Sequence, residues 1–345
     1  MARRSVQKGP RAAADSEGGS ESTGSDWTQQ DSAVTLACMR ICIIGSGAMG
    51  SLFGGRLSLA GFDVVLYDIF REHVEKVQRD GLAIEDAASG AVTTARPSAS
   101  ANSEAARGAD VLIIFVKSTA TEEAAARFAP LAGPATIVLT LQNGLGNESI
   151  IAAKFGAERT AAGVTSQGAT FVGPGRIRHA GTGPTHICMS DRRNEKLGPL
   201  RGALEKAGFE THVSGDVAGL VWSKLVINVG INALTAITGQ VNGKLVESEE
   251  TKAIIADLVR EAVAVARARG IELSYEDPLS VVYDVARKTG ANRSSMLQDF
   301  DKHRPSEIEV MNGAIVREAS RAGIPVPVNA TITRVIRAME RTWGA

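Results

Sequence analysis

The chain of 345 residues has no excess of charge and no long hydrophobic run. Its 38 basic residues equal its 38 acidic residues, so the charge balance favours neither a nucleic acid nor an anionic membrane surface as a partner. No uninterrupted apolar run approaches the roughly 18–20 residues that are needed to span a bilayer. We therefore expect no nucleic acid and no membrane among the partners.

Cysteine is scarce as well. Cys38, Cys42 and Cys188 form no CxxC motif, and their odd number argues against a disulfide framework. Such cysteine usage is typical of the reducing cytoplasm, which is the predicted localisation. The five histidines are scattered and form no HExxH motif, so no metal site is predicted.

The first 38 residues differ from the rest of the chain. They are rich in serine, glycine and acidic residues and show no hydrophobic periodicity, so residues 1–38 are predicted to be a disordered extension. The segment lacks the apolar core of a secretory signal, and its acidic residues argue against a transit peptide. Met39 stands immediately before the first apolar run, where a natural start would lie.

Four short apolar runs with helical patterns between them follow this extension. Continuous apolar runs of this length are typical of parallel strands that are covered on both faces. Alternation of strands with helices indicates a Rossmann-like doubly wound α/β domain. The predicted strands are Ile41–Ile44, Phe62–Tyr67, Val111–Val116 and Thr136–Leu141, and the helices include Met49–Ala60 and Thr121–Phe128.

The second half of the chain changes character near Gly215. Before it, Ile177–His179 and Thr185–Cys188 are predicted to extend the sheet. After it, helical patterns dominate and prolines punctuate them. We therefore predict a Rossmann domain over residues 39–214 and an all-α substrate domain over 215–345, with helices at Val217–Thr238, Glu249–Arg269, Ser306–Ala322 and Asn329–Arg341.

A glycine-rich turn follows the first predicted strand. It has the G-x-G-x-x-G pattern directly between a strand and a helix, which is the context that a dinucleotide site requires. Gly45 permits the tight turn, Gly47 lets the backbone approach a pyrophosphate, and Gly50 permits close packing of helix on strand. The exposed N–H groups at the helix start favour phosphate. The predicted cofactor-binding residues here are Gly45, Ser46, Gly47, Ala48, Met49 and Gly50.

Asp68 ends the second predicted strand, where a carboxylate accepts hydrogen bonds from the hydroxyls of the adenosine ribose. Its negative charge would repel a 2′-phosphate and so favours NAD. Arg71, three residues later, is either a cradle for such a phosphate or an ordinary solvated helix residue, and the sequence leaves both interpretations open.

Lys224, Asn228 and Asn232 are spaced four residues apart in an otherwise apolar helix, which places them on one face. Buried polar groups need partners, and asparagine is a poor helix former, so this stripe favours a substrate-facing role over a solvated surface. Ser294 and Ser295 have a plainer explanation as a helix cap, and Glu307 has one as a first-turn acid.

Taken together, these motifs resemble the ketopantoate reductase family, with agreement in order and spacing from Met39 to about Asn329. The resemblance implies NADPH-dependent reduction of 2-dehydropantoate to (R)-pantoate, on the route to pantothenate and coenzyme A. It is carried by Gly45–Gly50, Lys117, Gln142–Gly146, Trp222–Leu225 with Asn228 and Asn232, Asn242 with Gly243, Ser294–Asp299, Glu307, and Asn312 with Gly313.

The resemblance implies a role for each matching residue. Lys224 is the proton donor to the substrate carbonyl, and Glu307 is an acid beside that lysine and the nicotinamide ribose. A free lysine titrates near ~10.4, so the sequence predicts a charged Lys224 without tuning. Asn143 stands at the junction of nicotinamide and substrate, and Lys117 and Ala169 contact the cofactor.

The substrate's hydroxyl and carboxylate are assigned, by the same resemblance, to Asn228, Asn232, Asn242 and Ser295. One position departs from the family, because Ile69 stands where members commonly carry an arginine that binds the 2′-phosphate. The resemblance makes NADPH the expected cofactor, whereas this departure and the charge of Asp68 make NAD possible.

Two alternatives remain at this stage. The first is a reductase of another branched 2-oxo acid, and the second is a cofactor-binding regulator without turnover, which would not need Lys224. The expected partner is a small 2-oxo acid, and the chain is expected to be a monomer or a homodimer.

Overall fold

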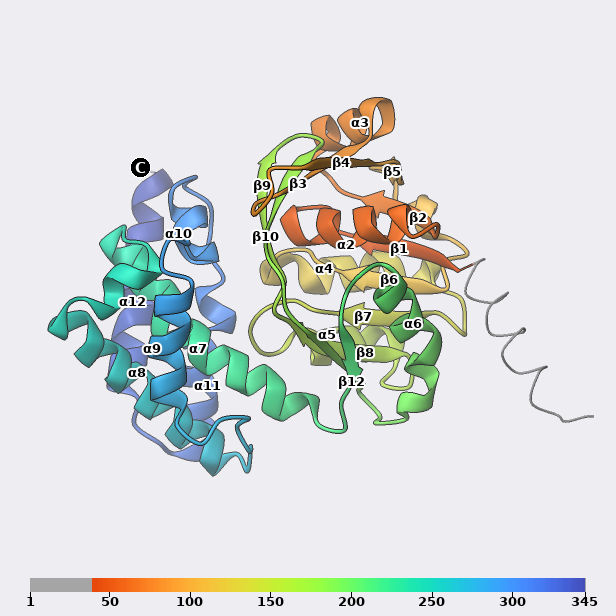
Figure 1. Cartoon of the computed structure of the whole chain (residues 1–345). Helices are drawn as coiled ribbons and strands as arrows, with labels where there is room; N and C mark the ends of the chain where they lie inside the picture. Colours follow the sequence, from red (N-terminus) through yellow and green to blue (C-terminus); the bar gives the residue numbers. More distant parts are fainter. Residues whose placement is uncertain (1–38, 345) are drawn as a thin grey trace, which may run out of the picture.

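The structure is a computed structural model, and it describes residues 39–344. The predicted disordered extension of residues 1–38 lies outside the described residues. Figure 1 shows an α/β domain and a helical domain that lie side by side. The chain passes from the first to the second between β12 (Thr211–Val213) and α7 (Val217–Thr238), which is where residues 214 and 215 lie.

An eight-stranded sheet forms the centre of the N-terminal domain. β1 lies in its middle, and successive strands are added first on one side of β1 and then on the other. The ligand crevice of such sheets opens at the carboxyl ends of the strands where the order reverses. In spatial order the strands are β12, β11 (Thr185–Met189), β8 (Thr160–Thr165), β7 (Ile137–Thr140), β6 (Val111–Ile114), β1 (Arg40–Ile44), β2 (Asp63–Tyr67) and β5 (Ser98–Ser100).

Both faces of this sheet are covered by helices, which explains why its central strands are apolar throughout. Ile41 and Ile43 point into one core cluster, whereas Cys42 and Ile44 point into another on the opposite face. The first face packs against α2 (Ala48–Leu59), α3 (Arg71–Asp80) and α6 (Gly198–Lys206), and the second against α4 (Thr121–Phe128) and α5 (Asn147–Phe155). The predicted Rossmann-like doubly wound domain is thus confirmed.

A second, four-stranded sheet was not expected from the sequence. Its order is β4 (Val92–Ala95), β3 (Leu82–Asp86), β10 (Arg176–Gly181) and β9 (Gly168–Gly173). Thr185–Cys188 extends the main sheet as predicted, but the prediction was wrong for Ile177–His179, which belongs to β10. Contacts between distant segments place Ile177–His179 in the second sheet. β10 pairs with β3, and His73 Nδ1 accepts a hydrogen bond at 3.0 Å from Gly175 N in the β9–β10 turn.

The C-terminal domain is all-helical, as predicted, and α7 forms its centre. By length and composition α7 is the one helix among residues 39–344 that would suffice to cross a membrane, but it is mostly buried against its neighbours and belongs to the domain core. Its partners are α8 (Glu249–Ala268), α9 (Pro278–Lys288), α10 (Ser295–Phe300), α11 (Asn312–Ala322) and α12 (Pro327–Arg341).

Two details of the helical domain differ from the expectation. The predicted helix Ser306–Ala322 is interrupted, since a short 3₁₀ turn, η6 (Ile308–Val310), precedes α11 and Met311 leaves helical geometry with φ −106° and ψ −105°. The carbonyl of Val310 instead accepts a hydrogen bond from Leu145 N of the other domain at 3.0 Å. In addition, α9 and α10 were not predicted, although Pro278 is the first residue of α9, where proline is favoured.

Further 3₁₀ turns link the main elements. They are η1 (Ser103–Ala106), η2 (Ser118–Ala120), η3 (Ala129–Leu131), η4 (Asn194–Leu197), η5 (Asn242–Val246) and η7 (Thr342–Gly344). Of these, η2 matters most for the site, because it follows β6 at the carboxyl edge of the sheet and faces the helical domain.

Candidate active site

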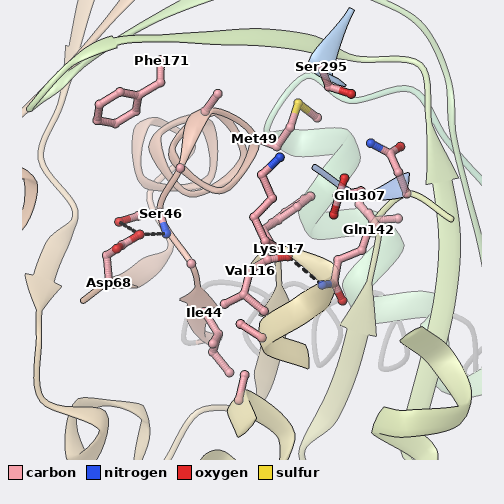
Figure 2. A pocket seen from close by; sticks show the side chains of 18 of the residues that line it. Ile44, Ser46, Met49, Asp68, Val116, Lys117, Gln142, Phe171, Ser295 and Glu307 are labelled. Carbon is pink, nitrogen blue, oxygen red and sulfur yellow. Dashed lines mark hydrogen bonds between the residues drawn. The ribbon is translucent and has the colours of Figure 1, made fainter. Parts of the chain in front are cut away.

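A cavity of about 650 Å³ lies between the two domains. It begins at the glycine-rich turn after β1, passes the ends of β2, β6 and β7, and reaches Lys224 on α7. Figure 2 shows Ser46 and Asp68 on one side of it and Gln142 and Glu307 on the other. Its volume lies within the range of ordinary small-molecule and cofactor sites, about 300–1,000 Å³.

The glycine-rich turn has the geometry that a phosphate needs. Gly45 has φ +92°, and a Cβ there would lie 2.7 Å from Val116 N, so only glycine fits. A Cβ on Gly50 would lie 2.0 Å from Gly45 O, whereas a Cβ on Gly47 would meet no atom within 4 Å. Gly47 is also the N-cap of α2 and provides no side-chain cap. Open space thus adjoins the start of α2, where the free N–H groups of a helix N-terminus suit a dinucleotide's pyrophosphate.

Asp68 lies beside this turn at the end of β2. Its Oδ2 accepts hydrogen bonds from Ser46 N at 2.7 Å and Ser46 Oγ at 3.2 Å, and its Oδ1 accepts one from Phe70 N at 2.9 Å (Figure 2). The carboxylate thus fixes the turn to the strand end while it lines the cavity. Arg71, in contrast, is exposed and does not line the cavity.

Lys224 occupies the other end of the cavity. Its Nζ donates a hydrogen bond to the carbonyl oxygen of Thr165, which ends β8 in the Rossmann domain, at 2.9 Å. Burial lowers the pKa of Lys224 to about 8, although the nearby Glu307 carboxylate opposes the shift. Lys224 thus stays charged at neutral pH, as expected, but with a lowered pKa that the sequence did not predict, because desolvation of the ammonium outweighs the attraction of one acid.

Glu307 is buried and reaches across to the Rossmann domain. Its Oε1 accepts hydrogen bonds from Ser118 N at 3.0 Å and Ser118 Oγ at 2.6 Å. It is thus not a solvent-facing first-turn acid. A second bridge joins the same two domains, since Lys117 Nζ donates to Asp299 Oδ2 of α10 at 2.6 Å. Burial raises the pKa of Asp299, while Lys117 acts against that shift. Side chains from both domains are therefore needed to form this end.

Comparisons with known proteins bear on what this arrangement does. The family model described as ketopantoate reductase PanE/ApbA matches residues 41–191, and the model of the family's C-terminal part matches residues 216–340. The 2-dehydropantoate 2-reductase of Halobacterium salinarum is 36% identical over 304 residues, which cover 88% of this chain and 99% of that protein. The chain belongs to the ketopantoate reductase family.

Other members agree with this assignment. The 2-dehydropantoate 2-reductase of Archaeoglobus fulgidus is 33% identical, and the match covers 88% of this chain and 99% of that protein. The crystal structure of a family ketopantoate reductase from Ralstonia eutropha JMP134 superposes with a TM-score of 0.81 at 34% identity and covers 89% of this chain and 100% of that one. This chain is therefore an oxidoreductase, and a regulator without turnover is disfavoured.

A further solved structure extends the range of chemistry. D-mandelate dehydrogenase, solved with NADH and anilino(oxo)acetate, superposes with a TM-score of 0.82 at 28% identity, and the match covers 89% of this chain and 100% of that chain. A solved structure of this fold thus holds NADH together with an oxoacetate ligand.

Most of the residues that the sequence singled out meet in the cavity. Those that line it are Gly45, Ser46, Gly47, Ala48, Met49, Asp68, Lys117, Asn143, Ala169, Lys224, Ser295 and Glu307. Gly50 lies behind the turn, where its lack of a side chain permits helix packing. Ser294, not Ser295, is the N-cap of α10, since its Oγ accepts a hydrogen bond from Leu297 N at 3.1 Å.

Three predicted substrate residues do not line the cavity: Asn228, Asn232 and Asn242. Asn232 is buried, and its Nδ2 lies 3.5 Å from the sulfur of Met311. Asn242 is buried and donates to Thr289 Oγ1 at 2.8 Å, while its Oδ1 has no hydrogen-bond partner. The helical spacing that placed Lys224, Asn228 and Asn232 on one face holds, but only the lysine reaches the cavity.

Several lining residues had no predicted role. Gln142, after β7, donates to Val116 O at 2.7 Å (Figure 2). It also donates to Thr121 Oγ1 at 2.9 Å. Asp299 lies four residues after Ser295 on α10, a spacing that would have placed both on one helix face. Phe171 lines the cavity from β9 of the second sheet. No sequence pattern predicted that this sheet lies beside the cavity.

Proposed function

We propose that this chain reduces 2-dehydropantoate to (R)-pantoate with a nicotinamide dinucleotide, as a step of pantothenate and coenzyme A biosynthesis. The observation that carries the proposal is a single cavity with a glycine-rich turn at one end and, at the other, a half-buried lysine whose pKa is lowered. The relatives named 2-dehydropantoate 2-reductase, at 30–36% identity, support the same activity.

The residues at the turn would hold the dinucleotide. The N–H groups at the start of α2 would face the pyrophosphate, and Asp68 would accept hydrogen bonds from the adenosine ribose. Lys117, Asn143 and Ala169, which line the cavity beyond the turn, would contact the nicotinamide half. When bound, the nicotinamide supplies the hydride that reduces the carbonyl carbon of the substrate.

Lys224 supplies the proton. As the carbonyl is reduced, negative charge develops on its oxygen, and the Nζ ammonium both stabilises that charge and donates a proton to it. A pKa of about 8 leaves Lys224 mostly protonated at neutral pH, yet makes it a better donor than an ordinary lysine. The carbonyl of Thr165 directs Nζ by accepting one of its hydrogen bonds, and solvent then restores the proton.

Glu307 acts as a positioning residue at the same end. Its carboxylate is fixed by two hydrogen bonds from Ser118, and its negative charge keeps the pKa of Lys224 from falling further. Ser295 lies on the cavity wall, where its hydroxyl is available to the substrate carboxylate.

A second candidate is the reduction of another branched 2-oxo acid. It is favoured by the observation that Asn232 and Asn242, which the family resemblance assigns to the substrate's hydroxyl, lie outside the cavity and have other contacts. A site without these amides has less reason to require a hydroxylated substrate.

The adenosine end supports NADH over NADPH, in contrast to the first expectation. The Asp68 carboxylate lines the cavity, whereas Arg71 is exposed outside it, and Ile69 stands where the family resemblance implies an arginine. A carboxylate beside the ribose disfavours a 2′-phosphate through repulsion.

One kinetic comparison tests these proposals together. Initial rates are measured for 2-dehydropantoate, for 3,3-dimethyl-2-oxobutanoate, which is the same molecule without its hydroxyl, and for phenylglyoxylate, each with NADH and with NADPH. The proposal expects the highest kcat/KM for 2-dehydropantoate with NADH. A preference for the substrate without the hydroxyl would favour the second candidate, and no turnover of any 2-oxo acid would contradict both.

We also propose a cytoplasmic location and a monomeric or homodimeric state. Cys42 and Cys188, the cysteines of the described residues, are free and buried, which suits a reducing compartment. Sedimentation velocity would distinguish the two states.

A further inference from the structure

The edge strand β9 of the second sheet runs along the cavity from one end to the other. It starts just after Thr165, whose carbonyl holds Lys224, and its side chains alternate in direction. Gln167, Ala169 and Phe171 line the cavity, while Val172 does not and is 46% exposed. Gln167 just before β9, and Ala169 and Phe171 within it, thus present side chains to the cavity at every second position, and Phe171 is the one farthest along the chain from Thr165.

Phe171 lies near an apolar surface at the end of β2. Its ring centroid is 6.3 Å from that of Phe70 and 5.2 Å from that of His73. Ile69 is 78% exposed and Phe70 is 43% exposed, although both line the cavity. Adjacent large apolar side chains left open to solvent beside a cavity mark a surface that a ligand covers. Figure 2 shows Phe171 on the side of Ser46 and Asp68, away from Glu307.

We propose that Phe171 is an affinity-determining residue whose ring covers the adenosine half of the bound dinucleotide, with Ile69 and Phe70 as the adjoining apolar wall. The inference rests on the proposed use of a nicotinamide dinucleotide. A purine presents flat apolar faces, and an aromatic ring packed against it excludes water and adds stacking. Phe171 has no polar atom, so it contributes to binding and not to the chemistry at Lys224.

A purely structural role for Phe171 makes different predictions. The ring also packs partly against the core of the Rossmann domain and against His73, which anchors the β9–β10 turn through Gly175. If packing were its only role, its loss would lower the melting temperature and weaken every ligand alike. A cover over adenosine instead weakens only those ligands that carry adenosine.

The test measures dissociation constants by calorimetry for ADP-ribose, which carries adenosine and pyrophosphate, and for nicotinamide mononucleotide, which carries neither adenosine nor the second phosphate. Phe171→Ala is expected to raise the dissociation constant of ADP-ribose about tenfold, the scale of one base–aromatic contact, and to leave the mononucleotide unchanged. Val172→Ala, on the outer face of the same strand, serves as the matched control and is expected to stay within about twofold.

Equal binding of ADP-ribose to the wild type and to Phe171→Ala would overturn the inference, and so would an equal loss for both ligands. Phe171→Leu guards against misfolding, since it keeps apolar bulk beside His73; its melting temperature should match the wild type while ADP-ribose binding is still weakened. Wild-type affinity in Phe171→Leu would contradict a role for the ring. Failure of the wild type to bind any dinucleotide would count against the proposed function instead.

Discussion

The two ends of the cavity are built by different means. The turn at Gly45–Gly50 consists of backbone groups within one domain, and its shape is set by positive φ and by close atomic contacts. The end at Lys224 consists of long side chains of the helical domain that are held by groups of the Rossmann domain, Lys224 by the carbonyl of Thr165 and Glu307 by Ser118. The first end exists whenever the Rossmann domain is folded, whereas the second depends on how the two domains meet.

The two ends are therefore suited to different tasks, binding and proton transfer. A backbone turn binds phosphate without any adjustment of a pKa, because backbone N–H groups do not titrate. A proton donor needs a pKa near the working pH, and burial between two domains supplies it for Lys224. Substitutions at one end should therefore affect binding, and those at the other should affect the rate of the chemical step.

The largest expected effect is on the rate. Lys224→Ala removes the proton donor and is expected to lower kcat by roughly 10²–10⁴-fold while the dissociation constant of NADH stays the same. Lys244→Ala is the control, because Lys244 is an exposed lysine of the same domain that pairs with Glu247. Single-turnover rates and NADH fluorescence titrations provide the two readouts. A Lys224→Ala enzyme with weakened NADH binding and an unchanged rate would break the comparison.

At the other end, Gly47→Val is expected to abolish measurable dinucleotide binding without unfolding the domain, because the new side chain would enter the open space meant for phosphate. Gly198→Val on α6 is the control, since a Cβ there also meets no atom within 4 Å but lies away from the cavity. Calorimetric titration and thermal unfolding would check both. Unchanged binding in Gly47→Val would remove the turn from the cofactor site.

The smallest expected effect concerns the choice of cofactor. Asp68→Ala should raise the ratio of kcat/KM for NADPH to that for NADH by roughly 5–10-fold, because a carboxylate that repels the 2′-phosphate is lost. Arg71→Ala should change the ratio by less than about twofold, since Arg71 is exposed and does not line the cavity. A large shift toward NADH in Arg71→Ala would restore the earlier interpretation, in which Arg71 binds the phosphate.

The same contrast governs what the sequence was able to predict. The central strands and the glycine turn follow from local patterns, and the structure confirms both. The second sheet, the break at Met311 and the position of Phe171 depend on pairing between distant segments, which periodicity does not encode. The role of Lys224 came from a family resemblance, but its lowered pKa required the structure, because desolvation depends on everything packed around it.

The substrate side shows the limit of helical spacing as a guide. Asn228 and Asn232 share a helix face with Lys224, yet of these three residues only Lys224 lines the cavity. Asn242 lies on η5, where Thr289 occupies its amide. Spacing predicts which side chains are neighbours on a helix, whereas the neighbouring domain decides which of them meet a ligand.

The central claim is that Lys224, with its lowered pKa, donates the proton. The most direct test is the pH dependence of kcat/KM for reduction of 2-dehydropantoate. The protonated lysine is the active form, so activity should be full below the pKa of about 8 and fall about tenfold per pH unit above it. Lys224→Arg should lack this falling limb, because arginine stays charged. A wild-type profile that remains flat to roughly pH 10, as for an ordinary lysine, or a falling limb that persists in Lys224→Arg, would contradict the account.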